Sequence, residues 1–137
     1  MTNLAIEAQG LVKTFGKNRA VDGVNLSIPT GSICGVLGPN GAGKTTTINM
    51  LATLSKPDSG SAKIFGYDVL KETQKVRQLI GLTGQYASID ESLTAMENLT
   101  IFGRLHGYSR KDSKRKATEL LEEFGLSEAA NKALSQF

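Results

Sequence analysis

The sequence predicts an α/β core followed by a helical subdomain, and three observations support this. A glycine-rich loop at residues 38–45 stands between a short apolar run and a helical pattern. The segments before the loop alternate apolar and polar residues, as antiparallel strands do. After residue 86 the signals are capping boxes and apolar residues at helical spacing. We therefore expect a core over residues 1–85 and a helical subdomain over residues 86–137.

Strands are expected before the loop. Residues 4–13 alternate in part, and residues 24–28 alternate cleanly before a Pro-Thr-Gly turn. Residues 32–37, S-I-C-G-V-L, have the composition of a buried strand that leads into the loop. The only cysteine, Cys34, is expected to be buried there as a small hydrophobic side chain rather than a reactive thiol.

The loop itself reads G-P-N-G-A-G-K-T, the complete G-x-x-x-x-G-K-[ST] motif. Its glycines let the backbone curl and bring N–H groups close to a polyphosphate, and the following helix directs its positive end at the same anion. We expect Lys44 to reach the outer phosphates and the Thr45 hydroxyl to ligate Mg2+. The loop residues predicted to bind nucleotide are Gly38, Pro39, Asn40, Gly41, Ala42, Gly43, Lys44 and Thr45. Strand, loop and helix together indicate a P-loop NTPase core, here partial and preceded by antiparallel strands, rather than a structural glycine loop.

The rest of the core reads as short elements. The helix after the loop carries Ile48, Leu51 and Ala52 on one face. Residues 56–60 form a turn, and residues 61–66 should be a strand. A short helix is expected near residues 71–78 and a further strand over residues 79–83.

Two helices are expected in the subdomain. Thr94 to Glu97 is a capping box, and Met96, Leu99 and Phe102 follow at helical spacing. Ser109 to Asp112 is a second capping box, before an apolar stripe of Ala117, Leu120, Leu121 and Phe124. Gly125 is the stop signal. His106, the only histidine, is expected to be structural or solvated at a helix end.

The composition excludes several classes of protein. Sixteen basic and 13 acidic residues give a net charge of +3, which is too balanced to predict a nucleic-acid surface. No apolar run reaches the length of a membrane span, and the N-terminus lacks signal-peptide features. A single cysteine excludes an internal disulfide, so we expect a reduced, cytoplasmic protein. The basic run over residues 110–116 reads as a solvated helix face, with a phosphate or lipid surface as the alternative.

Segments around the loop narrow the class further. They are K-T-F-G at residues 13–16, K-T-T-T at 44–47, P-D-S-G at 57–60, G-L-T-G-Q at 81–85 and L-T-A-M-E-N-L at 93–99. Over essentially all 137 residues, this order resembles the N-terminal half of the ATP-binding subunit of ABC transporters. The sequence of these segments is most similar to the drug-exporter, daunorubicin-resistance-like branch of the family.

The resemblance implies roles for individual residues. Phe15 matches the aromatic residue, more often tyrosine, that stacks on adenine. Thr46 matches the residue that contacts the inner phosphates. Gln85 matches the glutamine that reaches Mg2+ or the attacking water and links the core to the transporter; Gly84 stands where the family commonly has proline. The implied cofactors are ATP and Mg2+, with Thr45 and Gln85 on the metal side.

The same resemblance implies parts that these residues do not contain. Hydrolysis in the family needs an apolar strand ending in acidic residues (Walker B), a Gly-Gly signature segment and a later switch histidine. The sequence has no Gly-Gly pair and no such strand after the loop, so it looks like a truncated ABC ATPase with no catalytic residue of its own. We expect ATP binding without hydrolysis. We also expect residues 32–37 to expose apolar surface, because in the family strands of the other half flank them.

The leading functional prediction is the ATP-binding portion of a transporter that energises drug or small-molecule export. The implied partners are a second ATP-binding subunit in a head-to-tail dimer and an integral membrane permease, at the cytoplasmic face of the membrane. Gln85 and residues 86–137 are the expected permease contact. One alternative is a non-hydrolysing remnant or regulator that pairs with full-length subunits. Another is a different P-loop enzyme, such as a small kinase or GTPase, although no base-reading motif or lid pattern is evident.

Overall fold

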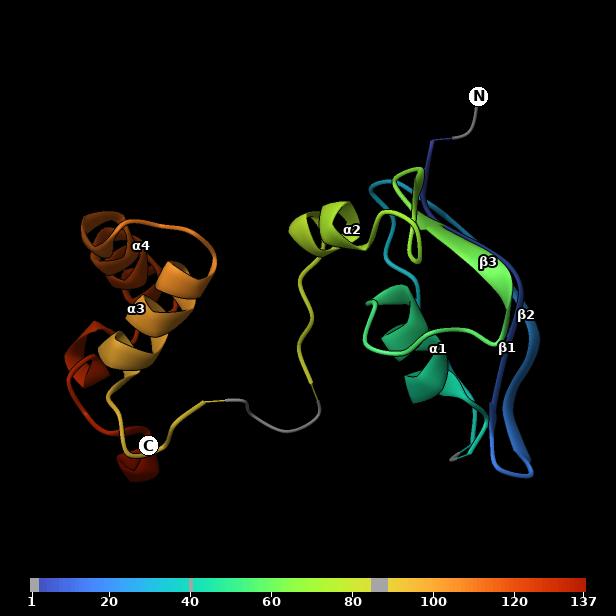
Figure 1. The fold of residues 1–137 in the computed structure, drawn as a ribbon. Coiled ribbons are helices and arrows are strands. Elements are labelled where there is room, and N and C mark those ends of the chain that lie inside the picture. Colours follow the sequence, from blue (N-terminus) through green and yellow to red (C-terminus); the bar gives the residue numbers. More distant parts are fainter. Residues whose placement is uncertain (1–2, 40, 85–88) are drawn as a thin grey trace. The chain divides into compact units, whose positions relative to one another are not determined.

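A computed structural model describes residues 3–39, 41–84 and 89–137 (Figure 1). The chain forms two compact units, Met1–Leu82 and Thr83–Phe137. In the described part of the chain, no helix is both long enough and apolar enough to cross a bilayer.

The first unit is built on an antiparallel sheet. Its strands are β1 (Leu4–Phe15), β2 (Asn18–Pro29), β3 (Ser59–Ile64) and β4 (Tyr67–Asp68), in the order β2-β1-β3-β4. Every neighbouring pair is antiparallel, which confirms the predicted N-terminal strands. Helices α1 (Lys44–Leu51) and α2 (Thr73–Leu79) lie on one side of this sheet (Figure 1). Leu11 of β1, Met50 of α1 and Val76 of α2 are fully buried in the shared core.

Two predicted strands are not formed. Residues 32–37 and 80–83 carry no strand structure, Leu79 is the last residue of α2, and Cys34 is exposed rather than buried. The composition of residues 32–37 suits a buried strand, but a strand also needs a hydrogen-bonded neighbour, and none of the described strands pairs with this run. Ile33 and Leu37 are therefore almost fully exposed, at 103% and 96%. The expected apolar surface is present.

The loop helix also differs from the prediction in the face that it buries. Helix α1 buries Thr47 and Met50 against the sheet. Of the predicted apolar face, Leu51 is partly buried against the core, whereas Ile48 is 41% exposed. Periodicity therefore located the helix but only part of its buried face.

Among its described residues, the second unit contains two α-helices and two short 3-10 helices. These are α3 (Ala95–Leu105), α4 (Arg110–Glu123), and the 3-10 turns η1 (Ser127–Ala129) and η2 (Leu134–Gln136). The predicted capping box is formed, since the Thr94 hydroxyl accepts from the Glu97 N–H at 3.1 Å and the Glu97 carboxylate accepts from the Thr94 N–H at 3.0 Å. Reciprocal bonds of this kind fix the start of a helix.

Helix α4 begins and ends at the predicted signals. The Ser109 hydroxyl accepts from the Asp112 N–H at 3.1 Å, but the Asp112 carboxylate does not accept from the Ser109 N–H, so the predicted second capping box is only half formed. Gly125 follows the helix with φ 69°. Ala117 and Leu121 of the predicted stripe are buried, but Phe124 is 72% exposed. Phe124 is the C-cap residue, so its side chain lies where the helix has already ended.

Candidate nucleotide-binding site

The glycine-rich loop rests directly on β2. Gly41 and Gly43 have φ of 87° and 85°, in the left-handed region that favours glycine. A Cβ on Gly43 would lie 2.3 Å from the Ala20 carbonyl oxygen and 3.1 Å from Cγ2 of Val21. The absence of a side chain at Gly43 therefore lets the loop approach the strand closely, and this contact sets where α1 begins.

The start of α1 suits an anion. Gly43 is the N-cap residue, and it has no side chain with which to bond the first N–H groups of the helix. The first turn has no acidic residue to satisfy the helix dipole. Both the N–H and the hydroxyl of Thr47 donate to the Gly43 carbonyl oxygen, at 2.9 and 2.8 Å, and so hold the first turn in place. A phosphate group at this end would meet unopposed partial positive charge.

The motif side chains are grouped around this helix start. Lys44 donates from Nζ to the carbonyl oxygen of Gly38, so its ammonium group lies over the loop. The loop is closed on the other side by the Ala42 N–H, which donates to the Pro39 carbonyl oxygen at 3.1 Å. Thr45 is exposed and Thr46 is half-buried on the first turn of α1. Asn40 and Gln85 lie outside the described residues.

Phe15 ends β1 and is 53% exposed. In the β1–β2 ladder Thr14 pairs with Arg19, one residue from the Ala20 carbonyl that Gly43 faces. Phe15 and the loop therefore lie at the same end of this ladder (Figure 1). An exposed aromatic face beside a phosphate loop can stack on a base.

Lys13 and Asp58, to which the sequence motifs assigned no role, contact Phe15 or the strand that carries it. Lys13 Nζ lies 5.5 Å from the centroid of the Phe15 ring. The same ammonium pairs with Asp58 at 3.6 Å, and Asp58 accepts from the Thr14 N–H at 2.7 Å. Asp58 belongs to the P-D-S-G turn at residues 57–60, so this turn is tied to the strand that carries Phe15. Both segments stood out in the sequence, but their contact joins residues more than 40 positions apart and could not be read from it.

A cavity beside the loop is lined mainly by apolar side chains, unlike the loop itself. It has a volume of about 410 Å³ and lies among β2, residues 32–37 and α1. Val24, Leu26, Val36, Ile48 and Leu51 give it an apolar lining, with Gly43 and Lys44 among the lining residues. Such a lining suits apolar side chains rather than a polyphosphate. The loop and the helix start, not this cavity, carry the phosphate chemistry.

A family model for ABC transporters matches residues 21–137, which include the whole loop and α1. The chain belongs to the ABC transporter family. The predicted resemblance and the P-loop NTPase fold class are thereby confirmed. Phe15 precedes the matched segment.

Relatives and solved structures of the ABC family agree with this assignment. The chain is 53% identical over 133 residues to the daunorubicin/doxorubicin resistance ATP-binding protein DrrA of Streptomyces peucetius, covering 97% of this chain and 40% of the relative. It therefore spans less than half the length of that ABC protein. The structure of the ADP conformation of MJ1267, an ATP-binding cassette of an ABC transporter, superposes with a TM-score of 0.80 at 28% identity, covering 98% of this chain and 59% of the other. A dimeric post-hydrolysis state of the ATP-binding cassette MJ0796, bound to ADP and Pi, superposes with a TM-score of 0.78 at 25% identity, covering 96% and 62%.

Proposed function

We propose that this chain is the ATP-binding portion of an ABC transporter that exports drugs or similar small molecules. The observation that carries the proposal is the complete phosphate loop, which ends at an uncapped helix start with Gly43 seated on β2 and Lys44 over the loop. The 53% identity to a drug-resistance ATP-binding protein supports export over import.

Each site residue has a distinct part in binding ATP with Mg2+. Lys44 swings from the Gly38 carbonyl to the outer phosphates, and the N–H groups at the start of α1 hold the same anion. Thr45 supplies a hydroxyl ligand to Mg2+, and Thr46 contacts the inner phosphates. The Phe15 ring stacks on adenine. Gln85 approaches Mg2+ or the attacking water.

These 137 residues are expected to bind ATP without turning it over. Hydrolysis needs a carboxylate that polarises water and an acidic residue that holds the metal, and no apolar strand ending in such residues follows the loop. Turnover would require a second ATP-binding subunit in a head-to-tail dimer, together with a Walker B strand, a signature segment and a switch histidine. In the transporter the pair would act on a membrane permease at the cytoplasmic face.

A second candidate function is a non-hydrolysing module that pairs with full-length subunits. It rests on the expectation that these residues bind ATP without hydrolysing it. The two candidate functions predict different behaviour of the chain in solution. Both expect contact with a second ATP-binding subunit, but only the second expects these 137 residues by themselves to alter the turnover of a complete subunit.

Calorimetric titration with ATP tests the proposal, with and without Mg2+. We expect saturable binding that Mg2+ strengthens and that Lys44→Ala weakens at least about tenfold, since a charged phosphate contact is lost. Lys56→Ala, which changes a lysine outside the loop, is the control. Equal binding by the wild-type and Lys44→Ala chains would refute the site. Phosphate release at about 1 per second or faster, typical of complete enzymes, would refute the absence of turnover.

A further inference from the structure

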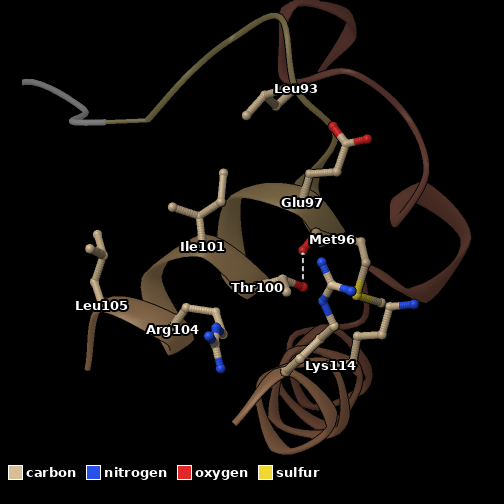
Figure 2. A pocket seen from close by; sticks show the side chains of 9 residues that line it. Leu93, Met96, Glu97, Thr100, Ile101, Arg104, Leu105 and Lys114 are labelled. Carbon is tan, nitrogen blue, oxygen red and sulfur yellow. Dashed lines mark hydrogen bonds between the residues drawn. The ribbon is translucent and has the colours of Figure 1, made fainter. Parts of the chain in front are cut away.

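The ammonium group of Lys13 is held in a defined place near the end of β1. Its Nζ donates to the Lys56 carbonyl oxygen at 2.8 Å and pairs with Asp58 at 3.6 Å. The Lys13 side chain is only 17% exposed, so both contacts are partly shielded from water. By contrast, Lys114 lines an open pocket of the helical unit (Figure 2) and forms no ion pair with any described carboxylate. The position of the Lys13 charge is therefore set by the fold.

This charge lies over the ring of Phe15. Lys13 and Phe15 are two positions apart on β1, and alternate residues of a strand share a side. The Lys13 Nζ is 5.5 Å from the ring centroid, within the distance of about 6 Å at which a cation and an aromatic face attract each other. Phe15 is nevertheless 53% exposed. One face of the ring therefore has a cation over it, while the residue as a whole stays open to a ligand.

Asp58 also fixes the backbone from which the ring projects. The Asp58 N–H donates to the Val12 carbonyl oxygen at 2.8 Å, and the Asp58 carboxylate accepts from the Thr14 N–H at 2.7 Å. Asp58 thus bonds to the strand on both sides of Lys13 and pairs with Lys13 itself. One acidic residue of the P-D-S-G turn therefore holds both the backbone next to Phe15 and the cation over its ring.

We propose that Lys13, held by Asp58, is a positioning residue that fixes the Phe15 ring for the base of the bound nucleotide. An exposed ring that turns freely loses side-chain entropy when a base stacks on it. A cation over one face reduces this cost before the nucleotide arrives, and it leaves the opposite face for the base. The inference deepens the proposed function and rests on it for the stacking role of Phe15. Lys13 acts through the ring rather than on the phosphates, because its charge is already paired with Asp58.

Titration calorimetry of the full 137-residue chain with ATP and Mg2+ tests the proposal. Lys13→Gln removes the cation, and we expect it to weaken ATP binding about three- to tenfold, the size of a partly shielded cation–π contact. Lys13→Arg should keep the wild-type affinity, because a guanidinium group also lies over an aromatic face. Lys17→Gln is the matched control, since it removes the same charge two positions from Phe15, and Lys17 lies over no ring of the described residues. It should leave the affinity nearly unchanged.

Two further variants separate the positioning of the ring from charge and from general packing. In a Phe15→Ala chain, Lys13→Gln should cause no further loss of affinity, because the ring on which Lys13 acts is absent. Asp58→Asn raises the net charge, so charge alone would strengthen the binding of a polyanion. We expect weaker binding instead, because the substitution releases Lys13. Circular dichroism and urea unfolding check that each variant is folded.

Three results would overturn the proposal. The first is an unchanged affinity in Lys13→Gln beside weakened binding in Phe15→Ala. The second is an equal loss from Lys13→Gln in the wild-type and Phe15→Ala chains. The third is binding by Asp58→Asn that is at least as tight as that of the wild-type chain. In each of these cases the wild-type chain still binds ATP, whereas a wild-type chain that does not bind ATP would contradict the proposed function itself.

Discussion

Gly43 lies so close to Ala20 that a Cβ on Gly43 would be 2.3 Å from the Ala20 carbonyl oxygen. Gly41 has a similar φ, 87° against 85°, but has no heavy atom of the described residues within 4 Å of such a Cβ. Substitution of the two glycines therefore distinguishes the cost of backbone strain from the cost of a steric clash. At Gly41 alanine meets strain alone, and at Gly43 it meets strain and a collision.

Gly43→Ala should destabilise the chain more than Gly41→Ala. Left-handed backbone costs a non-glycine residue about 1–2 kcal/mol, and overpacking adds about 1–3 kcal/mol at Gly43 only. Urea unfolding of the two variants measures the difference. Equal stabilities would show that the loop does not rest on β2 as described.

Phe15→Ala should weaken ATP binding, because a stacked base contributes about 1–3 kcal/mol. Phe15→Tyr should bind as the wild type does, since it keeps the aromatic face. Phe124→Ala, which removes an aromatic ring that is 72% exposed at the end of α4, serves as the control. Titration calorimetry gives the affinities. Unchanged affinity in Phe15→Ala would remove Phe15 from the site.

The contact between α3 and α4 depends on a small residue at Gly103. A Cβ there would lie 2.8 Å from the Ser113 hydroxyl oxygen, which is buried without a hydrogen-bond partner among the described residues. Gly103→Ala should therefore destabilise the helical unit by about 1–3 kcal/mol. Ser113→Ala should be neutral or stabilising, because it removes a buried hydroxyl that has no partner.

The double variant tests whether these two effects share one cause. Adding Ser113→Ala to Gly103→Ala should recover part of the lost stability, since it removes the atom that the new methyl group meets. Thermal unfolding followed by circular dichroism provides the comparison. Strict additivity of the two substitutions would contradict the close approach.

The exposed residues 32–37 should make the isolated chain prone to association. Ile33 and Leu37 are 103% and 96% exposed, so replacing both with serine removes apolar surface without opening a cavity. We expect a larger monomer fraction in size-exclusion chromatography and an unchanged urea midpoint. Leu54→Ser, at a site that is 66% exposed on another segment, should have a smaller effect. An unchanged monomer fraction in the double variant would contradict association through residues 32–37.

Elements with local signals were predictable from the sequence. The capping box at Thr94 and Glu97, the stop at Gly125 and the antiparallel strands all formed where expected, because each depends on residues close together in the chain or on strand alternation. The predictions that were wrong concerned features that depend on residues far away in the chain. Residues 32–37 have the composition of a buried strand, but no described strand pairs with them, so Cys34 is exposed. Helix α1 buries Met50 rather than Ile48 against the sheet, a choice that depends on the strands and helix that form the shared core.

The phosphate loop and the family could both be predicted from the sequence. Lys44 and Thr45 follow the loop glycines at a fixed spacing, and short segments on both sides of the loop point to the family. Which segments meet at the site depends on the tertiary structure. The β1–β2 ladder brings Phe15 to the loop, and the Lys13–Asp58 pair ties the P-D-S-G turn to the strand of Phe15. The physical reason is that motif spacing is local, whereas strand register and close packing join residues far apart in the chain.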